Sequence, residues 1–291
     1  MPSGEPGRLD VVPRVAVVSA FEPELALLLA QVQQPRRYSV QGVEFTTGTL
    51  GGRPVVLFLS GISMVNAAMN TQRALDLFQV THIVFSGIAG GVNPQLHIGD
   101  VSVPAQWGQY LEVLAARETS PGVYAPPSRM GELPFAPFGM FYPRPVDVVS
   151  AAQPKPRKQF WFAVDAGMLA AARVLQSGGA VTLADCDAAR RCLRHAPRLA
   201  VGGNGVSGAS FMDNAALRQY TFSTFAANVI DMETAATAQV AASNGVPYIA
   251  FRSLSDLAGG GEGENEMKLF LSLAAENSAR VVTAFLQTWK P

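Results

Sequence analysis

The feature that most constrains the fold of this chain is a set of short apolar runs in which polar and apolar residues do not alternate. The clearest are residues 14–20, 82–86 and 248–254. Runs of this kind are typical of strands that are buried on both faces of a sheet. Segments with helical periodicity lie between them. This order predicts an α/β fold in which helices flank a mixed, largely parallel central sheet.

The remaining pattern supplies further elements of the same two kinds. Strands are predicted at 43–47, 54–59, 100–103, 199–206 and 228–230, and helices at 22–34, 63–78, 165–176, 231–244 and 264–289. Gly51 and Gly52 are predicted to form the turn between the strands at 43–47 and 54–59. We see no internal repeat and no linker. We therefore predict a flexible segment at residues 1–13 and a single domain at residues 14–291.

Residues 105–160 interrupt this alternation, because they are rich in proline, glycine and aromatic residues. A segment of this length inside a compact domain is usually either functional or disordered. The aromatic residues favour an ordered excursion that packs on another surface, as a lid or a subunit contact. A packed surface loop is the alternative interpretation.

Composition excludes two classes of protein. Charged residues make up 15% of the chain, against roughly 25% in an average soluble domain. The formal net charge is +0, whereas nucleic-acid-binding domains carry a basic excess. Hydrophobic residues make up 48%, whereas disordered chains combine low hydrophobicity with high net charge. We therefore expect a folded protein that does not bind nucleic acid.

The N-terminal region predicts neither a membrane span nor a secretory signal. Residues 11–30 are apolar overall, but Pro13, Arg14, Glu22 and Glu24 interrupt a stretch that would need roughly 20 mostly apolar residues. The first ten residues lack the apolar core of a signal peptide. We expect a cytoplasmic protein with no membrane partner by default. Export or a periplasmic location is the alternative if a signal peptide has been removed.

The few cysteine and histidine residues predict no metal site. The three histidines are not at the spacing of metal ligands, and no Cys-x-x-Cys motif occurs. Cys186 and Cys192 are six residues apart, which in a continuous helix is about 9 Å and places them on different faces. A disulfide between them needs an intervening turn. Two free thiols are the equally weighted alternative.

The ends of the predicted strands carry the residues most suited to chemistry. Ligands of open α/β sheets bind beyond the carboxyl ends of the strands. The residues at those ends include Phe21, Glu22, Glu24, Ile88, Ala89, Gly90, Phe211, Met212, Met232, Glu233, Ser255 and Asp256. Carboxylates at one rim could divide the acid and base steps of a hydrolase. Alternatively, the glutamates favour helix N-termini through the helix dipole, and Asp256 is a turn or capping residue.

The glycine cluster at residues 87–91 predicts no cofactor. It matches neither the dinucleotide-binding pattern nor the phosphate-binding loop, because no Gly-Lys-Ser/Thr follows it. Glycines here could instead allow the backbone to approach a ligand or another chain.

Together these segments resemble the nucleoside phosphorylase/nucleosidase superfamily. The similarity is greatest to the methylthioadenosine/S-adenosylhomocysteine nucleosidases, in a branch that includes the plant bark storage proteins. It covers the chain from about Val15 to the C-terminal helix. The matching segments, in the family's order, are residues 15–25, 60–63, 86–92, 98–104, 206–212, 231–236 and 252–256. Residues 99–107 and 201–207 are most similar to the storage-protein branch.

The resemblance implies a role for each matching residue. Asp256 would protonate purine N7, Glu24 would activate the attacking water, and Glu233 would accept hydrogen bonds from the ribose hydroxyls. The remaining implied roles are ribose packing by Met232, purine stacking by Phe211, backbone contact to the base by Met212, support of Asp256 by Ser255 and Arg252, and lining of the substrate site by Ile88, Ala89 and Gly90.

The resemblance and the local charge favour hydrolysis over phosphorolysis. The first strand-end loop, residues 19–24, is acidic and lacks the Gly-Asp-Pro-x-Arg pattern of many phosphorylases. The strand at 82–86 lacks the arginine of hexameric phosphorylases. We expect hydrolysis of the N-glycosidic bond of adenine nucleosides such as 5′-methylthioadenosine or S-adenosylhomocysteine. A phosphate-dependent phosphorylase and a non-catalytic, storage-like nucleoside-binding protein are the alternatives.

Three residues and one segment depart from the pattern of the family. Ile88 stands where a small hydroxyl residue is common, Ala209 where bacterial enzymes have an aspartate, and Asp231 where a glutamate is usual. The excursion at 105–160 is longer than in typical members and bears on the 5′ specificity. The resemblance implies a homo-oligomer, a dimer first, with a trimer or hexamer as the alternative.

Overall fold

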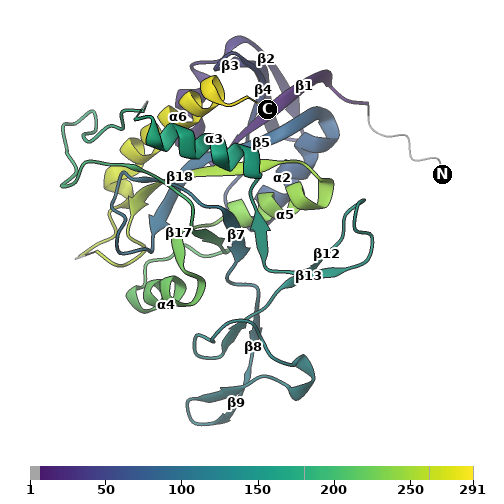
Figure 1. The fold of residues 1–291 in the computed structure, drawn as a ribbon, viewed down its shortest axis with the longest axis vertical. Coiled ribbons are helices and arrows are strands. Elements are labelled where there is room, and N and C mark those ends of the chain that lie inside the picture. The colour runs from purple at the N-terminus through teal and green to yellow at the C-terminus, as the bar shows by residue number, and fades with distance from the viewer. Residues whose placement is uncertain (1–6, 180, 262, 291) are drawn as a thin grey trace.

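A large mixed sheet forms the centre of the molecule (Figure 1). The computed structural model describes residues 7–179, 181–261 and 263–290. Within them, twelve strands form one sheet: nine follow the path β14-β7-β16-β17-β5-β1-β4-β3-β2, and the other three lie off it, with β18 paired with β5 and β6, and β6 paired with β15. These strands are β1 Asp10–Ser19, β2 Gln33–Val40, β3 Val43–Leu50, β4 Arg53–Leu59, β5 Phe78–Gly91, β6 Val101–Val103, β7 Gln106–Gln109, β14 Trp161–Ala163, β15 Leu199–Val201, β16 Asn204–Ser207, β17 Ala227–Asp231 and β18 Tyr248–Asp256.

The three apolar runs become neighbouring strands at the middle of this sheet. β1 pairs in parallel with β4 and β5, and β5 pairs in parallel with β18. Every residue of β18 is buried, as expected of a strand that is covered on both faces. Antiparallel pairings occur at the ends of the sheet, in β2–β3–β4 and β14–β7, and inside it, in β17–β5 and β18–β6. The predicted α/β class with a largely parallel central sheet is confirmed.

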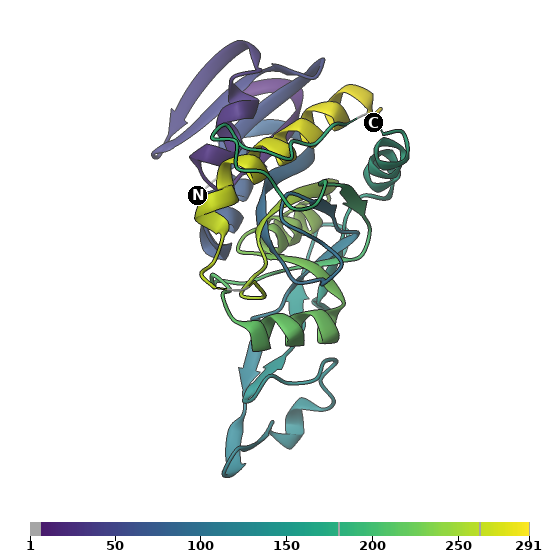
Figure 2. The ribbon, with the colours of Figure 1, turned by 90° about the vertical axis from the view of Figure 1, so that its left-hand side faces the viewer.

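Helices pack around the central strands (Figures 1 and 2). They are α1 Glu22–Leu29, α2 Met64–Leu77, α3 Ala166–Ser177, α4 Ala215–Phe225, α5 Thr234–Asn244 and α6 Met267–Thr288, with a short 3-10 helix at Ser128–Met130. α6 contacts β18, β5 and α1, whereas α2 contacts α5. By length and composition α6 could cross a membrane. In this fold it packs on the sheet, as the core helix of a folded domain does.

Several predicted boundaries were wrong. The helix expected at 22–34 ends at Leu29, and β2 follows from Gln33. The strand expected at 82–86 continues through the glycines, so these lie within β5 rather than in a loop. The strand expected at 199–206 is divided into β15 and β16 at Gly202 and Gly203, which both have positive φ. The sequence reading missed α4 and began α5 too early, at 231.

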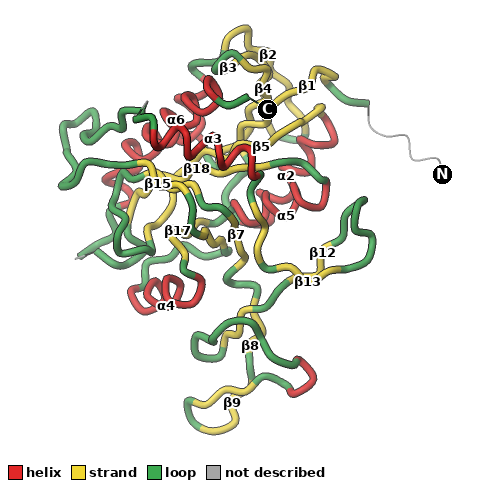
Figure 3. The backbone as a smooth tube through the Cα atoms, in the orientation of Figure 1, coloured by secondary structure: helices red, strands yellow, loops and turns green. Residues whose placement is uncertain are grey.

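The excursion at 105–160 is ordered and projects from the body (Figures 2 and 3). Its first strand, β7, belongs to the main sheet. Beyond β7 it forms three two-stranded sheets, built from β8 Val113–Ala115, β9 Arg117–Ser120, β10 Val123–Ala125, β11 Phe141–Pro143, β12 Val146–Val148 and β13 Arg157–Gln159. Aromatic contacts of Phe135 and Phe160 with Phe225 attach its base to α4. The prediction of an ordered, packed excursion is confirmed for this base.

A disulfide joins Cys186 to Cys192 in the loop between α3 and β15. The chain turns between the two cysteines, and the backbone N–H of Arg190 donates to the Asp187 carbonyl at 2.9 Å. Asp187 also forms an ion pair with Arg191 at 2.6 Å. The turn that a bridge between these cysteines needs is therefore present, and the alternative of two free thiols is wrong.

Candidate active site

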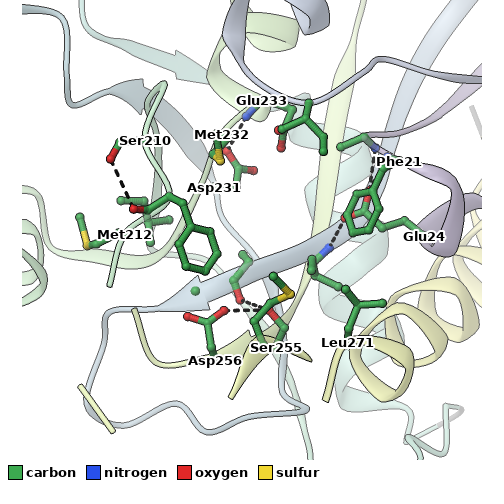
Figure 4. A pocket seen from close by; sticks show the side chains of 18 residues that line it. Phe21, Glu24, Ser210, Met212, Asp231, Met232, Glu233, Ser255, Asp256 and Leu271 are labelled. Atoms are coloured by element: carbon green, nitrogen blue, oxygen red, sulfur yellow. Dashed lines mark hydrogen bonds between the residues drawn. The ribbon is translucent and has the colours of Figure 1, made fainter. Parts of the chain in front are cut away.

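A cavity of about 250 Å³ lies at the carboxyl ends of the central strands (Figure 4). It is lined by Ala20, Phe21, Glu24, Ile62, Ile88, Ala89, Gly90, Ser210, Phe211, Met212, Ile230, Asp231, Met232, Glu233, Ser255, Asp256, Met267 and Leu271. Figure 4 shows Asp256 and Ser255 on one side, Met232 and Glu233 across from them, and Glu24 beside Phe21. The predicted strand-end residues therefore meet in one place.

Asp256 is the last residue of β18 and is buried. Its carboxylate accepts hydrogen bonds from Ser255 Oγ at 2.9 Å, from the backbone N–H of Ala258 at 2.8 Å and from Asn265 Nδ2 at 3.3 Å. Burial raises the pKa of Asp256 and outweighs these hydrogen bonds. A carboxyl group that keeps its proton at a higher pH is suited to act as a general acid.

Glu24 lies in the first turn of α1 and is 1% exposed. One carboxylate oxygen accepts the backbone N–H of Ile88 at 2.7 Å, and the other accepts that of Ala20 at 2.7 Å. Burial raises the pKa of Glu24, although the Arg252 charge and these amides oppose the shift. These backbone N–H groups hold the Glu24 carboxylate at the cavity wall, against the end of β1 and against β5. Glu22, by contrast, is exposed and lies outside the cavity.

Glu233 lies between β17 and α5, where it is the residue before the first helical turn. Its Oε1 accepts the backbone N–H of Ser63 at 2.8 Å, which ties it to the start of α2. Burial raises the pKa of Glu233 to about 7, with smaller opposing and reinforcing effects from Arg252 and Asp231. The Glu233 side chain therefore lines the cavity with one carboxyl oxygen tied to the start of α2.

Arg252 does not support Asp256, contrary to expectation. It is fully buried, and its guanidinium lies 2.8 Å from Asp231, 3.7 Å from Glu24 and 3.6 Å from Glu233. It also lies over the Phe85 ring, with 4.1 Å from Cζ to the ring centroid. Ser255 does bond to Asp256, as expected. Arg252 instead holds the other three acids together.

Gly87 explains why the glycine cluster lies beside these acids. A Cβ at this position would meet Arg252 Nη1 at 2.3 Å and Glu24 Oε1 at 2.6 Å. Gly90 similarly faces Asp256 Oδ1, at 3.2 Å from a Cβ placed there. The absence of side chains lets β5 run directly beneath the charged groups. The glycines therefore allow buried side chains of the same chain to approach β5 closely, and an approach to a ligand or another chain stays a prediction.

The described lining of the cavity contains four carboxyl groups and no lysine, arginine or histidine. Phe211, with 53% of its surface exposed, stands at the rim, whereas Met212 is buried. Such a lining can donate a proton, accept protons and hydrogen bonds, and stack on a flat ring, but it opposes a bound anion. No group of three His, Cys, Asp or Glu among the described residues is arranged to hold a metal ion.

The profile of the Phosphorylase superfamily matches residues 14–287. The chain belongs to this superfamily. It is 30% identical to the 5′-methylthioadenosine/S-adenosylhomocysteine nucleosidase of Halalkalibacterium halodurans, over 94% of this chain and 97% of that protein. It is 29% identical to the protein of the same name from Bacillus thuringiensis, over 95% of this chain and all 100% of that one.

Solved structures of nucleosidases share the fold of the chain. A 5′-methylthioadenosine/S-adenosylhomocysteine nucleosidase from Neisseria meningitidis, in complex with methylthio-immucillin-A, gives a TM-score of 0.70 at 24% identity and covers 94% of this chain and 98% of its own. An S-adenosylhomocysteine nucleosidase from Streptococcus pyogenes, in complex with 5-methylthiotubericidin, gives a TM-score of 0.71 at 22% identity. The match covers 96% of this chain and 98% of that one.

Several residues that line the cavity were not predicted from the sequence. Asp231 was noted only as a departure from the family pattern, yet it lines the cavity. Ile62, Met267 and Leu271 also line it. Ile62 lies in one of the matched segments, which was a signal for it. Met267 and Leu271 come from α6, whose position over the sheet no local pattern indicates.

Proposed function

We propose that the protein hydrolyses the N-glycosidic bond of adenine nucleosides that carry a 5′-thio substituent, such as 5′-methylthioadenosine or S-adenosylhomocysteine, and releases adenine. The observation that carries this proposal is the cavity at the strand ends, with four carboxyl groups and no cationic side chain in its described lining. The names of the curated relatives support the same reaction and the same substrates.

In this reaction Asp256 gives a proton to N7 of the purine, so that adenine leaves as a neutral base. The bond between C1′ and N9 breaks, and its electron pair goes to the base. Glu24 accepts a proton from water while the water oxygen bonds to C1′. Glu233 accepts hydrogen bonds from the ribose hydroxyls, and the negative groups around the sugar stabilise its developing positive charge. Phe211 stacks on the purine, Met232 packs on the ribose, and the Met212 backbone faces the base.

Water is the nucleophile that suits this cavity better than phosphate. A phosphorylase has to bind a phosphate dianion beside C1′, usually with arginine side chains. The only guanidinium near this position is that of Arg252 among the described residues, and three carboxylates surround it. Those carboxylates would repel phosphate.

The apolar end of the cavity is where the 5′ substituent would lie. Phe21, Ile62, Met267 and Leu271 contribute apolar side chains to the lining. A thioether is apolar and polarisable, so it fits beside aromatic, aliphatic and methionine side chains. Ile62 is 50% exposed, which leaves this end open for a longer substituent.

The test is an adenine-release assay with purified protein on methylthioadenosine, S-adenosylhomocysteine, adenosine and inosine, each with and without phosphate. We expect adenine from the 5′-thio nucleosides at equal rates with and without phosphate. Phosphate-dependent formation of ribose 1-phosphate would establish a phosphorylase instead. Binding of adenine with no turnover of any substrate would establish a non-catalytic nucleoside-binding protein.

We further propose that the protein is a homodimer joined through α2 and α5. A groove between these helices is lined by Met64, Val65, Ala68, Gln72, Gln109, Ala236, Gln239, Val240 and Ser243, all uncharged. Val65 is 79% exposed and Met69 is 47% exposed on the same helix. An uncharged surface with large exposed apolar side chains is typical of a subunit interface. A second copy is the occupant that best fits it, because a two-fold axis would set this groove against itself.

A further inference from the structure

Four charged side chains meet in a buried cluster at the wall of the cavity. Glu24 comes from α1, Asp231 from the end of β17, Glu233 from the turn before α5, and Arg252 from β18. β5 contributes only uncharged groups, the Phe85 ring and the Ile88 carbonyl. One guanidinium therefore faces three carboxyl groups, and the way its charge is shared decides which of them can be ionised.

Asp231 is the partner that holds the guanidinium directly. Its Oδ2 lies 2.8 Å from Arg252 Nε, whereas the two glutamates lie 3.6 Å and 3.7 Å from the outer nitrogens. Thr234 Oγ1, which donates to Asp231, also accepts from Arg252 Nη2 at 2.8 Å. Asp231 and Thr234 therefore hold the guanidinium on one side, and its Nη1 and Nη2 atoms face Glu24 and Glu233.

Asp231 is itself fixed by the backbone. Its Oδ1 accepts the N–H groups of Glu233 and Thr234, both at 3.1 Å, and the hydroxyl of Ser207. Ser207 Oγ accepts the N–H of Ala235 at 2.8 Å, so the carboxylate and the hydroxyl together satisfy the start of α5. The Asp231 side chain therefore fixes the backbone of Glu233 at the cavity and holds Arg252 next to it.

We propose that Asp231 is the positioning residue of this site, which holds Arg252 between Glu24 and Glu233 and sets how much positive charge each glutamate receives. This inference rests on the proposed function. The inference extends that function to Asp231, which is neither the acid, the base nor the ribose-binding residue. It assigns to Asp231 control of the pH range in which the reaction runs. The negative charge of Asp231 also raises the pKa of Glu233, in addition to the larger effect of burial.

The test is the pH profile of kcat/KM for methylthioadenosine in Asp231→Asn. Without the aspartate charge, Arg252 is shared by the glutamates alone, and its charge favours their ionised forms. We expect the acidic limb to move to lower pH by about one unit, and kcat to fall more than KM rises. Asp231→Glu keeps the charge and should restore the wild-type profile. An acidic limb that stays in place in Asp231→Asn overturns the proposal.

Asp100→Asn is the matched control. Asp100 is also buried, accepts two backbone N–H groups, from His97 at 3.0 Å and Arg198 at 2.8 Å, and lies 3.8 Å from an arginine, but it does not line the cavity. Its substitution should lower the melting temperature with no shift of the profile. If Asp100→Asn shifts the limb equally, Asp231 has no special role.

A binding measurement separates this proposal from the proposed function. A carbon-linked adenosine analogue, which cannot be hydrolysed, is titrated into wild-type protein and Asp231→Asn between pH 5 and pH 8. We expect the pH dependence of its Kd to shift in the variant in the same direction as the kinetic limb. If wild-type protein releases no adenine, the proposed function fails, but the shift in Kd still tests Asp231. An identical Kd profile in both proteins overturns the role of Asp231.

Discussion

At the scale of single residues, the environments of the acids differ and suit them to different tasks. Asp256 receives hydrogen bonds from Ser255, Ala258 and Asn265, and no arginine of the described residues forms an ion pair with it. Glu24 and Glu233 share the buried Arg252. Carboxyl groups whose surroundings hold their protons differently are the usual basis for dividing acid and base roles. Burial raises the pKa of Asp256 and no described arginine opposes this shift, which suits Asp256 to donate a proton.

Asp256→Asn is expected to abolish adenine release while leaving the fold intact. The amide has nearly the same shape but cannot donate a proton to N7 in the same way, and loss of a general acid typically costs about 10²–10⁴-fold in rate. Adenine release, circular dichroism and melting temperature are measured on the same preparations. Near wild-type activity would remove Asp256 from the acid role.

Glu233→Gln is expected to stabilise the fold above neutral pH. The pKa of Glu233 is raised from 4.5 to about 7, so the folded state binds a proton that the unfolded state has released. The unfolding free energy attributable to this group therefore falls as pH rises from 4.5 to about 7, by up to about 3 kcal/mol. Below pH 4.5 both states are protonated, and the difference vanishes.

The measurement for Glu233→Gln is the melting temperature at pH 5 and pH 8. The variant should melt above wild type at pH 8, with a much smaller difference at pH 5, and should lose activity. Glu132→Gln, at an exposed position in the excursion, is the control and should show no such pH dependence. A difference that is the same at both pH values would contradict the expected cost of ionising Glu233.

At the scale of elements, the glycines of β5 and the disulfide of the loop after α3 have different structural consequences. β5 carries Gly87 and Gly90 so that charged groups from α1 and β18 can lie against its backbone. The loop after α3 is closed by its disulfide and held by Asn277 of α6, whose Oδ1 accepts the N–H of Ala184 at 2.7 Å. The first feature builds the site, and the second attaches a long connection to the core.

Replacing both Cys186 and Cys192 by serine is expected to lower stability without changing adenine release. The bridge closes a short loop, with a sequence separation of 6, for which chain entropy gives about 2 kcal/mol. Neither cysteine lines the cavity. Thermal unfolding and the adenine-release assay, each with and without reductant, check both parts. Thiol titration of protein taken directly from its native compartment tests the exported alternative, because disulfides persist in oxidising compartments.

At the scale of the whole molecule, the low charge content has two structural counterparts. The central strands of the sheet are buried on both faces, which uses many uncharged residues. The surface between α2 and α5 is also uncharged, and α5 contains no charged residue at all. Ile62, just before α2, lines the cavity, so an interface on this surface would border the site.

Val65→Asp is expected to convert the proposed dimer to a monomer. An aspartate at this exposed position costs little in the free subunit but would be buried without a partner in the interface. Light scattering coupled to size exclusion gives the mass. Val174→Asp, on α3 and 70% exposed, is the matched control and should leave the mass unchanged. A wild-type protein that is monomeric, or a dimer that survives Val65→Asp, would exclude this interface.

The sequence by itself determined the fold class and the strand-end part of the site, because both depend on local patterns. Uninterrupted apolar runs mark strands that are buried on both faces, and the carboxyl ends of parallel strands meet at one rim. Glu24, Glu233 and Asp256 could therefore be predicted to converge, and they do.

Only the tertiary structure decided how the buried charges are shared. Arg252 was expected beside Asp256, four residues away in the same strand, but its guanidinium extends to Glu24, Asp231 and Glu233. Those contacts join α1, β17, β18 and the start of α5, whose mutual positions no local pattern contains. The contribution of α6 to the cavity, through Met267 and Leu271, has the same origin. Electrostatic balance in a buried cluster depends on distances between distant segments, and these exist only once the chain has folded.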